Sequence, residues 1–317
     1  MSVSVIITCF NEGHFLRAAV DSVLGQSRSD VIEQIVICDD GSDAETQAVL
    51  KEITARDPRI SILPVADDKP AGKRGVSLNR NRGVAMTKSA YIAFLDADDL
   101  WRDHKLERQL ALINARSDTA FVYTAFSLFW SDNRKPPEVA PLVDLTSQTD
   151  QPLSYFTDDP PIVPSTVLMR RTLWDKLGGF DEKLEVFEDT EFFFRATKHG
   201  HAAALPTPLV DKRLHDLAIT SRRSELMKHH AYVAFHIATQ EPRLLPYVAH
   251  RLSERARKLG NLEALDGRSE TAANLLRSAI SFNLLNVRAW LTLLLHHLGG
   301  ASAMRVVKLT LLRTSRS

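Results

Sequence analysis

Three aspartates follow a short apolar run in the first third of the chain. Asp96, Asp98 and Asp99 come directly after Tyr91–Leu95. Two carboxylates at i and i+2 beyond a strand can converge through a loop on a hard cation, and Mg²⁺ and Mn²⁺ prefer such oxygen ligands. The competing interpretation is that Asp98 or Asp99 caps a helix that begins near Trp101. Polar residues at other strand ends accompany this group, so we favour a metal site.

A second acidic pair, Asp39-Asp40, also follows an apolar run. A carboxylate beyond a strand can accept hydrogen bonds from the N–H of a base or from a ribose hydroxyl. An Asx turn followed by a helix cap explains the same residues equally simply. Asn11 and Glu12 stand in the corresponding position after the first apolar run, Ser2–Cys9.

Basic residues form a third group. Arg80 and Asn81 lie in a predicted helix, Val76–Thr87, and Lys73 and Arg74 lie in the glycine-containing loop before it. Arg80 can pair with phosphate oxygens, and glycines let backbone N–H groups approach them. A solvated charged face is the alternative for Lys73 and Arg74. The chain has neither G-x-x-x-x-G-K-[ST] nor G-x-G-x-x-G, which argues against a P-loop and against nicotinamide or flavin cofactors.

Two further candidates lie beyond residue 180. Glu188 and Asp189 begin a predicted amphipathic helix, Asp189–His199, and such carboxylates can supply a general base. The alternative is that these acids only complement the helix dipole. His215 follows Arg213, where a neutral imidazole could complete a metal shell or contact a diphosphate. A surface histidine with neither role is the simpler interpretation.

These residues follow or begin elements that alternate along the chain. We predict strands at Ser2–Cys9, Gln34–Cys38, Ile60–Val65 and Ala90–Leu95, separated by helices at Phe15–Leu24, Asp43–Ala55 and Val76–Thr87. This order predicts an α/β fold with a mostly parallel sheet covered by helices. In such sheets ligands bind at the carboxyl ends of strands, where the candidate residues stand.

The rest of the chain has a different character. We expect a helix at residues 100–116 and strands at Ala120–Phe129, Thr166–Arg170 and Ala202–Leu209. Residues 130–164 contain seven prolines and are predicted to be irregular. From about Ser224 the pattern is helical only, with helices expected at Glu270–Phe282 and Val287–Leu298.

Charge and composition limit the classes of function. Lys and Arg total 40 against 39 Asp and Glu, so the basic excess expected of a nucleic-acid-binding protein is absent. No acidic residue follows Glu270, whereas six basic residues do. Cys9 and Cys38 lie inside apolar runs, as expected of buried thiols in a reducing compartment. The start lacks a signal-peptide pattern, and no apolar run reaches the ~20 residues of a membrane span, so we expect a cytoplasmic protein.

The motifs together resemble the family 2 glycosyltransferases of the GT-A fold. The matching segments are VSVIITCFNE, ICDDGSDAET, SLNRNRGVAMTKSAYIAFLDADDLW and LGGFDEKLEVFEDTEFFFR. The resemblance implies a GT-A domain over residues 1–220, with a nucleotide-sugar half at 1–116 and an acceptor half at 117–220. Residues 221–317 would form an all-α C-terminal region. The Q-x-x-R-W motif of processive membrane-embedded synthases is absent.

The resemblance also implies roles for single residues. Asp39 would contact the base, Arg80 the diphosphate, and Asp96 the ribose and the metal. Asp98, together with Asp96 and His215, would ligate Mn²⁺ or Mg²⁺. Asp189 would be the catalytic base with Glu188 as its neighbour. The full set implied to bind the nucleotide sugar is Asn11, Glu12, Asp39, Asp40, Arg80, Asn81 and Asp96.

We therefore expect metal-dependent, inverting transfer from a nucleoside-diphosphate sugar, with a uridine diphosphate favoured. The acceptor would be a hydroxyl of a saccharide or of a lipid-linked saccharide, in the synthesis of a cell-surface polysaccharide or glycolipid. The basic apolar segment Met304–Leu312 could lie on the inner face of an anionic membrane, or form a last helix packed on the catalytic domain.

Three other functions are also compatible with parts of the sequence. A phosphatase of the haloacid-dehalogenase type would use Asp96 as nucleophile, but leaves Asp39, Arg80 and Glu188 unexplained. A nucleotidyltransferase fits the fold, but the chain has no G-x-G-T-R signature near its start. An interaction protein with a non-catalytic GT-A domain would use the helical end as its binding surface.

Overall fold

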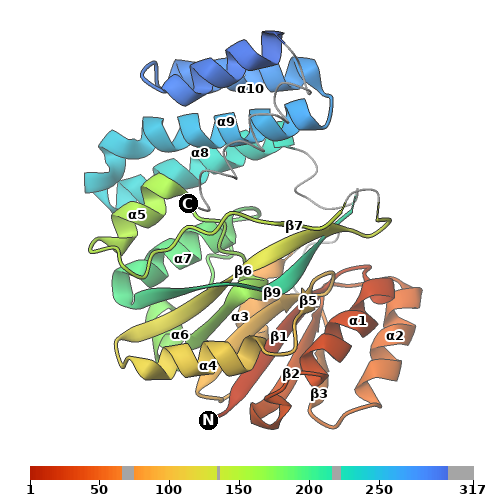
Figure 1. Ribbon diagram of the computed structural model, residues 1–317. Helices are drawn as coiled ribbons and strands as arrows, with labels where there is room; N and C mark the ends of the chain where they lie inside the picture. Colours follow the sequence, from red (N-terminus) through yellow and green to blue (C-terminus); the bar gives the residue numbers. More distant parts are fainter. Residues whose placement is uncertain (66–74, 134–135, 216–222, 299–317) are drawn as a thin grey trace. The chain divides into compact units, whose positions relative to one another are not determined.

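The computed structural model describes residues 1–65, 75–133, 136–215 and 223–298 and divides the chain into two units (Figure 1). Unit 1 comprises Met1–Tyr155 and Pro160–Asp216, and unit 2 comprises Phe156–Asp159 and Leu217–Ser317. The domain boundary predicted near residue 220 falls outside the described residues, as do the basic loop residues Lys73 and Arg74 and the segment Met304–Leu312.

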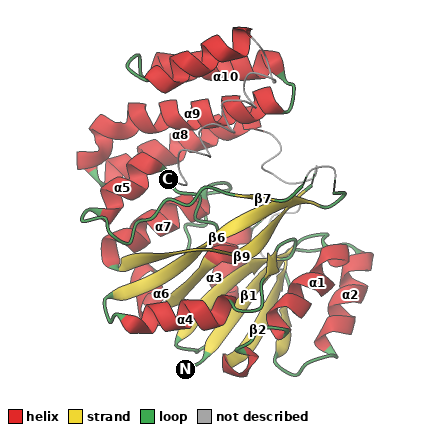
Figure 2. Cartoon of the chain, in the orientation of Figure 1, coloured by secondary structure: helices red, strands yellow, loops and turns green. Residues whose placement is uncertain are grey.

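Unit 1 is built on one nine-stranded mixed sheet of order β3-β2-β1-β4-β8-β6-β9-β5, with β7 paired to β6 (Figure 2). The strands are β1 (Val3–Cys9), β2 (Ile32–Asp39), β3 (Ile60–Leu63), β4 (Tyr91–Asp96), β5 (Leu100–Trp101), β6 (Thr119–Trp130), β7 (Glu138–Val139), β8 (Val167–Arg170) and β9 (His201–Leu214). The first four strands pair in parallel, as predicted. Strand β8 runs antiparallel between β4 and β6, and β6 pairs in parallel with β9.

Helices cover both faces of this sheet because the strand residues alternate in direction. Val5 and Ile7 of β1 pack in one core with Leu16 of α1 and Leu106 of α4. On the opposite face α3 packs closely against β1. A Cβ added at Gly83 of α3 would lie only 2.8 Å from Ile6 of β1. The helices are α1 (Gly13–Leu24), α2 (Ala44–Thr54), α3 (Val76–Ala85), α4 (Lys105–Ala115), α5 (Gln151–Asp158), α6 (Arg171–Leu177) and α7 (Glu188–His199).

Two predictions about elements were wrong. Residues 130–164 are not wholly irregular, since they contain β7 and α5. Pro152 stands in the first turn of α5, where its missing N–H removes no helical hydrogen bond. The helix expected at residues 100–116 begins later than predicted, which also excludes the alternative that Asp98 or Asp99 caps a helix near Trp101. That residue pairs with Val210 in the sheet, and the helix begins only at Lys105.

In unit 2 the described residues 223–298 form helices, as the sequence predicts. They are α8 (Arg223–Gln240), the short 3₁₀ helix η4 (Pro242–Tyr247), α9 (Val248–Leu265), α10 (Ser269–Phe282) and a last helix over residues 287–298. None of the helices in the described ranges is both long and apolar enough to cross a membrane.

Both cysteines of unit 1, Cys9 and Cys38, are buried free thiols, as expected.

A buried ion cluster joins α9 to Phe156–Asp159, the short N-terminal piece of unit 2. Asp159, only 6% exposed, lies 2.8 Å from Arg251 and 2.9 Å from Arg255, and Lys258 is 3.8 Å away. The pKa of Asp159 is lowered, although burial alone would raise it, because these cations outweigh the burial. This carboxylate is therefore ionised in the folded protein.

Candidate functional site

The register of the parallel strands brings the sequence candidates to one edge of the sheet. Cys9 lies opposite Asp39 in the β1–β2 pair, and Thr8 lies opposite Asp96 in the β1–β4 pair. The strands therefore end side by side, and the residues that follow them share the same edge.

A group of metal-ligand type forms where β4 ends. Asp98 Oδ2 lies 3.1 Å from Nε2 of His215, which follows β9. Glu12, Asp98 and His215 each offer a ligand atom, and these atoms lie within 4.8 Å of one another. Asp96, Asp98 and Asp99 form a second such group. Carboxylate oxygens suit Mg²⁺ and Mn²⁺, so the residues at this strand end fit the predicted metal.

Arg80 connects this group to the start of α7. The side chain is only 4% exposed, and its two terminal nitrogens donate to Asp96 Oδ1 at 2.8 Å and to Glu188 Oε1 at 2.7 Å. Burial alone would raise the pKa of Asp96, but Arg80 and Lys212 hold it below its ordinary value. Arg80 also stacks over the ring of Phe180 at 5.3 Å. One buried guanidinium thus fixes the distance between the strand-end aspartates and the helix acids.

The two acids at the start of α7 are poised to take up protons. Burial, reinforced by the neighbouring Asp189, raises the pKa of Glu188 to about 7. Burial also raises the pKa of Asp189, whose Oδ1 accepts a hydrogen bond from the Thr190 N–H at 2.6 Å. A carboxylate whose pKa approaches the working pH is a better general base than one in water.

A partly buried lysine that the sequence interpretation missed lies beside the aspartates. Nζ of Lys212 is 3.7 Å from Oδ2 of Asp99, and this oxygen also accepts a hydrogen bond from Ser165 at 2.7 Å. Burial raises the pKa of Asp99 to about 7. Burial would lower the pKa of Lys212, but Asp99, Asp98 and Asp96 raise it, so the ammonium is charged. The predicted strand ended at Leu209, and only its extension to Leu214 brings Lys212 here.

Arg213 holds the aspartate loop from the same strand. Its guanidinium lies between the rings of Phe15 and Phe129, at 4.3 and 4.5 Å. Its Nε donates to the backbone oxygen of Asp98 at 2.9 Å, and its backbone N–H donates to Asp99 Oδ1 at 3.1 Å. The end of β9 therefore positions the loop that carries the metal-ligand candidates.

Two predicted nucleotide-binding aspartates accept hydrogen bonds from the turn after β2 and from the helices α2 and α3. Asp39 accepts from Gln47 Nε2 at 2.6 Å and from the Ser42 N–H at 3.1 Å. Asp40 accepts from Asn79 Nδ2 at 2.6 Å. Their contact with a nucleotide stays a prediction.

Two asparagines of the predicted set also have structural partners. Asn11 has the left-handed φ of 57° and accepts from the Asp43 N–H at 2.8 Å. Asn81 exchanges hydrogen bonds with the backbone of Phe180, at 3.0 and 2.9 Å. It fills the space beside Gly179, where an added Cβ would lie 2.5 Å from its oxygen. Asn81 thus holds the loop before α7 in place through its hydrogen bonds to Phe180.

The chain matches one family model and several curated relatives. The family model described as Glycosyl transferase family 2 matches residues 4–178. A glycosyltransferase of Nostoc, described as uncharacterized, is 38% identical over 108 residues, which cover 34% of this chain and 31% of the relative. TuaG of Bacillus subtilis, named for teichuronic acid biosynthesis, is 34% identical over 130 residues, 41% of this chain and 48% of TuaG.

A further relative is named for a defined reaction. The Escherichia coli protein WfgD, a "UDP-Glc:alpha-D-GlcNAc-diphosphoundecaprenol beta-1,3-glucosyltransferase", is 30% identical over 139 residues, 44% of this chain and 51% of WfgD. The chain thus spans about half the length of these curated relatives or less.

Solved structures share the fold. S. aureus TarS 1–349 in complex with UDP-GlcNAc aligns with a TM-score of 0.60 at 17% identity, over 89% of this chain and 81% of the other. The mannosyltransferase PcManGT of Pyrobaculum calidifontis, in complex with GDP-Man and Mn²⁺, aligns with a TM-score of 0.59 at 16% identity, over 97% and 86%. At these identities the likeness establishes the fold alone.

Proposed function

The chain belongs to glycosyl transferase family 2 and has the GT-A fold, and we propose that it transfers a sugar, with inversion, from a nucleoside-diphosphate sugar to an acceptor hydroxyl. The observation that carries the proposal is the link through Arg80, which donates both to Asp96 and to Glu188. This link places metal-ligand candidates and base candidates on two sides of one small site.

The donor side contains the metal-ligand candidates. Asp98, Asp96 and His215 would hold Mn²⁺ or Mg²⁺. Asp98 is the residue shared by the two ligand groups, one with Glu12 and His215 and the other with Asp96 and Asp99. When bound, such a cation neutralises the charge that develops on a leaving diphosphate. Arg80 and Lys212 add fixed positive charge beside the same aspartates. Residues 1–116 would supply most of this side, with the turn at Asp39 and Asp40 facing the nucleotide.

The acceptor side contains the base. Asp189 takes the proton of the acceptor hydroxyl as that oxygen forms a bond to the anomeric carbon. The bond from this carbon to the diphosphate breaks in the same step, and the diphosphate leaves with the electron pair. A single displacement of this kind inverts the anomeric centre. Burial and, to a smaller extent, the nearby Asp96 raise the pKa of Asp189, which strengthens it as a base. Glu188, its neighbour in the chain, is held by Arg80.

The relatives suggest which donor and acceptor to test. WfgD is named for UDP-Glc and for a diphosphoundecaprenol-linked acceptor, and the TarS structure holds UDP-GlcNAc. We therefore propose a UDP-sugar donor and a lipid-linked or free saccharide acceptor, in polysaccharide synthesis. Such an acceptor would place the protein in the cytoplasm at the inner membrane face.

The test is release of nucleoside diphosphate and formation of product from a panel of UDP- and GDP-sugars, with Mn²⁺, with Mg²⁺ and with chelator. Asp98→Asn should lower turnover by about 10³-fold, because a charge-stabilising element of the transition state is lost. Asp118→Asn, a change at an exposed ion pair with Arg116, is the matched control and should leave turnover unchanged.

Two outcomes would overturn the proposal. The first is full turnover by Asp98→Asn or in the presence of chelator. The second is hydrolysis of simple phosphate esters without sugar transfer, as the phosphatase alternative requires. That alternative needs Asp96 as a nucleophile, whereas Oδ1 of Asp96 accepts hydrogen bonds from both Arg80 and Thr8.

A further inference from the structure

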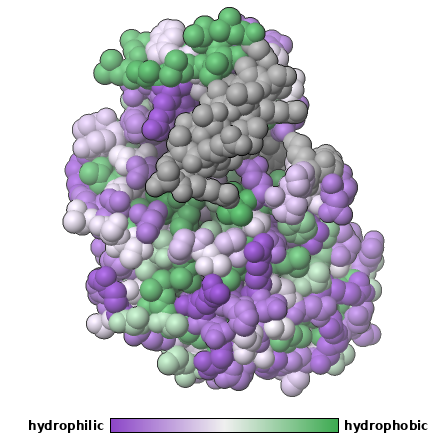
Figure 3. Space-filling view, viewed as in Figure 1, coloured by the Kyte–Doolittle hydropathy of each residue, from purple (hydrophilic) through white to green (hydrophobic). Residues whose placement is uncertain are grey.

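The last described helix, residues 287–298, exposes large apolar side chains on its outer face. Leu291 and Leu294 are 53% and 54% exposed, and Leu298 is 76% exposed. Val287 and Trp290 share this exposure, and so do Leu284 and Leu285 in the turn before the helix. Figure 3 shows apolar residues gathered over the C-terminal helices, at the top of the view.

The spacing makes these side chains one stripe. At 3.6 residues per turn, positions 287, 291, 294 and 298 fall on one line along a helix, and position 290 lies beside it. The two polar residues nearest to this stripe are Arg288 and His297, one on each side, and both are exposed. We call the five residues Val287, Trp290, Leu291, Leu294 and Leu298 the outer stripe.

The opposite face of this helix already has its partners within unit 2. Ala289 and Leu293 pack in a core with Ala256 of α9 and Ala279 of α10. His296 Nε2 lies 3.1 Å from both the hydroxyl and the carbonyl oxygen of Ser269. The helix therefore packs on unit 2 through one face, and the side chains of the outer stripe stay exposed on the other face.

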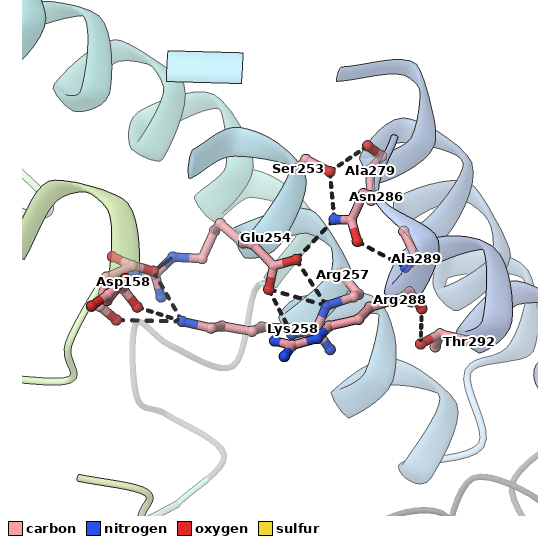
Figure 4. A network of polar contacts seen from close by, with 12 residues as sticks. Asp158, Ser253, Glu254, Arg257, Lys258, Ala279, Asn286, Arg288, Ala289 and Thr292 are labelled. Atoms are coloured by element: carbon pink, nitrogen blue, oxygen red, sulfur yellow. Dashed lines mark hydrogen bonds and ion pairs between the residues drawn. The ribbon is translucent and has the colours of Figure 1, made fainter. Parts of the chain in front are cut away.

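A polar network fixes this orientation (Figure 4). Asn286, at the start of the helix, donates from Nδ2 to Ser253 and to Glu254 of α9, each at 2.8 Å. Its Oδ1 accepts from the Ala289 N–H at 3.1 Å. These bonds join the helix start to α9, so the outer stripe cannot turn inward without breaking them.

The stretch of sequence that contains the outer stripe carries charge of one sign. No acidic residue follows Glu270 in the sequence, whereas Arg277, Arg288, Arg305, Lys308, Arg313 and Arg316 do. Arg277 and Arg288 are described and exposed. An apolar stripe that contains tryptophan and is bordered by cations matches an anionic lipid surface, where apolar side chains enter the acyl boundary and cations meet the headgroups.

We propose that the outer stripe docks the protein on an anionic membrane, with the helix lying in the plane of the interface. Twelve residues are too short to span a bilayer, so the contact is peripheral. The surface is distinct from the proposed transfer site. Its test measures binding alone, so failure of this inference leaves the transfer proposal standing, and the reverse also holds.

The experiment is co-flotation of the full chain with vesicles of equal parts phosphatidylglycerol and phosphatidylcholine, compared with vesicles of phosphatidylcholine only. We expect binding to the anionic vesicles that weakens with salt. Leu291→Gln together with Leu294→Gln should lower the partition coefficient about tenfold or more, because two apolar side chains no longer enter the acyl boundary. The matched control is Leu245→Gln, a leucine of η4 that is 48% exposed outside the stripe.

Trp290 gives a second readout. Trp101 and Trp174 are buried and Trp130 is partly buried, whereas Trp290 is 51% exposed. Anionic vesicles should shift the emission of the full chain to shorter wavelength, and Trp290→Phe should abolish most of that shift. Circular dichroism of each variant checks that unit 2 remains helical.

Each contrary result overturns the proposal. One is absence of flotation by the full chain, which would mean that the outer stripe is covered by the chain itself. Another is equal flotation by the double variant and by the Leu245→Gln control. A third is an oligomer in sedimentation that the double variant dissociates while vesicles have no effect, which would assign the stripe to a second copy.

Discussion

Two groups of carboxylates, one in each unit and each at least partly buried, differ in how many cations surround them. In unit 2 the single carboxylate Asp159 has Arg251, Arg255 and Lys258 within 3.8 Å, and its pKa is lowered. In unit 1 five acids, Asp96, Asp98, Asp99, Glu188 and Asp189, surround mainly Arg80 and Lys212.

The difference appears in the pKa values. Burial is the largest contribution in both groups, yet the pKa of Glu188 and that of Asp99 rise to about 7, because too few cations oppose the burial. The cluster at Asp159 has more cations than carboxylates and serves the structure. The cluster at the sheet edge has an excess of negative charge that a divalent cation and a transferred proton can neutralise.

Removal of the carboxylate from the Asp159 cluster should have the largest effect. Asp159→Asn removes the carboxylate that lies 2.8 Å from Arg251, which is 1% exposed, and should lower the free energy of unfolding of unit 2 by about 3–5 kcal/mol. Asp158→Asn, a change at the exposed neighbour, is the control. Chemical denaturation followed by circular dichroism measures both, and equal stability of the two variants would show that the cations do not depend on Asp159.

The pH dependence of stability should separate the two groups next. Because the pKa of Glu188 is raised from 4.5 to about 7, its carboxyl holds its proton longer in the folded state than in the unfolded state. Its stabilising contribution is present at low pH and is lost as the pH rises through about 7.

Glu188→Gln should remove this loss, which is on the order of 2 kcal/mol between pH 5 and pH 8. The measurement is the free energy of unfolding at several pH values in the presence of chelator. Asp159, whose pKa is lowered, contributes stability that is constant over this range. If the free energy of unfolding of the wild-type protein has the same pH dependence as that of Glu188→Gln, the raised pKa of Glu188 is contradicted.

A smaller effect should come from Lys212, and its direction is diagnostic. Nζ of Lys212 lies 3.7 Å from Oδ2 of Asp99. Lys212→Met should therefore strengthen Mn²⁺ binding about tenfold, because a competing positive charge is removed from the aspartates. Lys183→Met, at an exposed lysine, is the control. Calorimetric titration with Mn²⁺ measures both, and weaker binding by Lys212→Met would mean that Lys212 positions the ligands instead of competing with the metal.

The sequence predicted the sheet edge better than the rest of the site. Asp39 and Asp96 follow short apolar strands, and parallel strands place their carboxyl ends together, so local pattern was sufficient there. The bridge from Arg80 to Glu188 joins residues 108 positions apart, and no periodicity reports such a contact.

Other features depended on long-range packing. Lys212 was missed because β9 runs on to Leu214, where pairing with β6 overrides the polar character of the segment. Asn81 belongs to the arginine-asparagine motif, yet the structure uses it to hold Phe180, since only the folded chain brings α3 to that loop. The helix α5 was missed because the prolines around it dominated the local pattern.

The most direct test of the account is the chemical step in Asp189→Asn. We would measure single-turnover transfer of the sugar from the accepted donor in the presence of Mn²⁺, and donor binding by calorimetry. Asp175→Asn, at an exposed position of α6, is the control. The account predicts that transfer falls by about 10³-fold while donor binding changes by less than about threefold, because only the base is lost. Transfer at the wild-type rate by Asp189→Asn would contradict it.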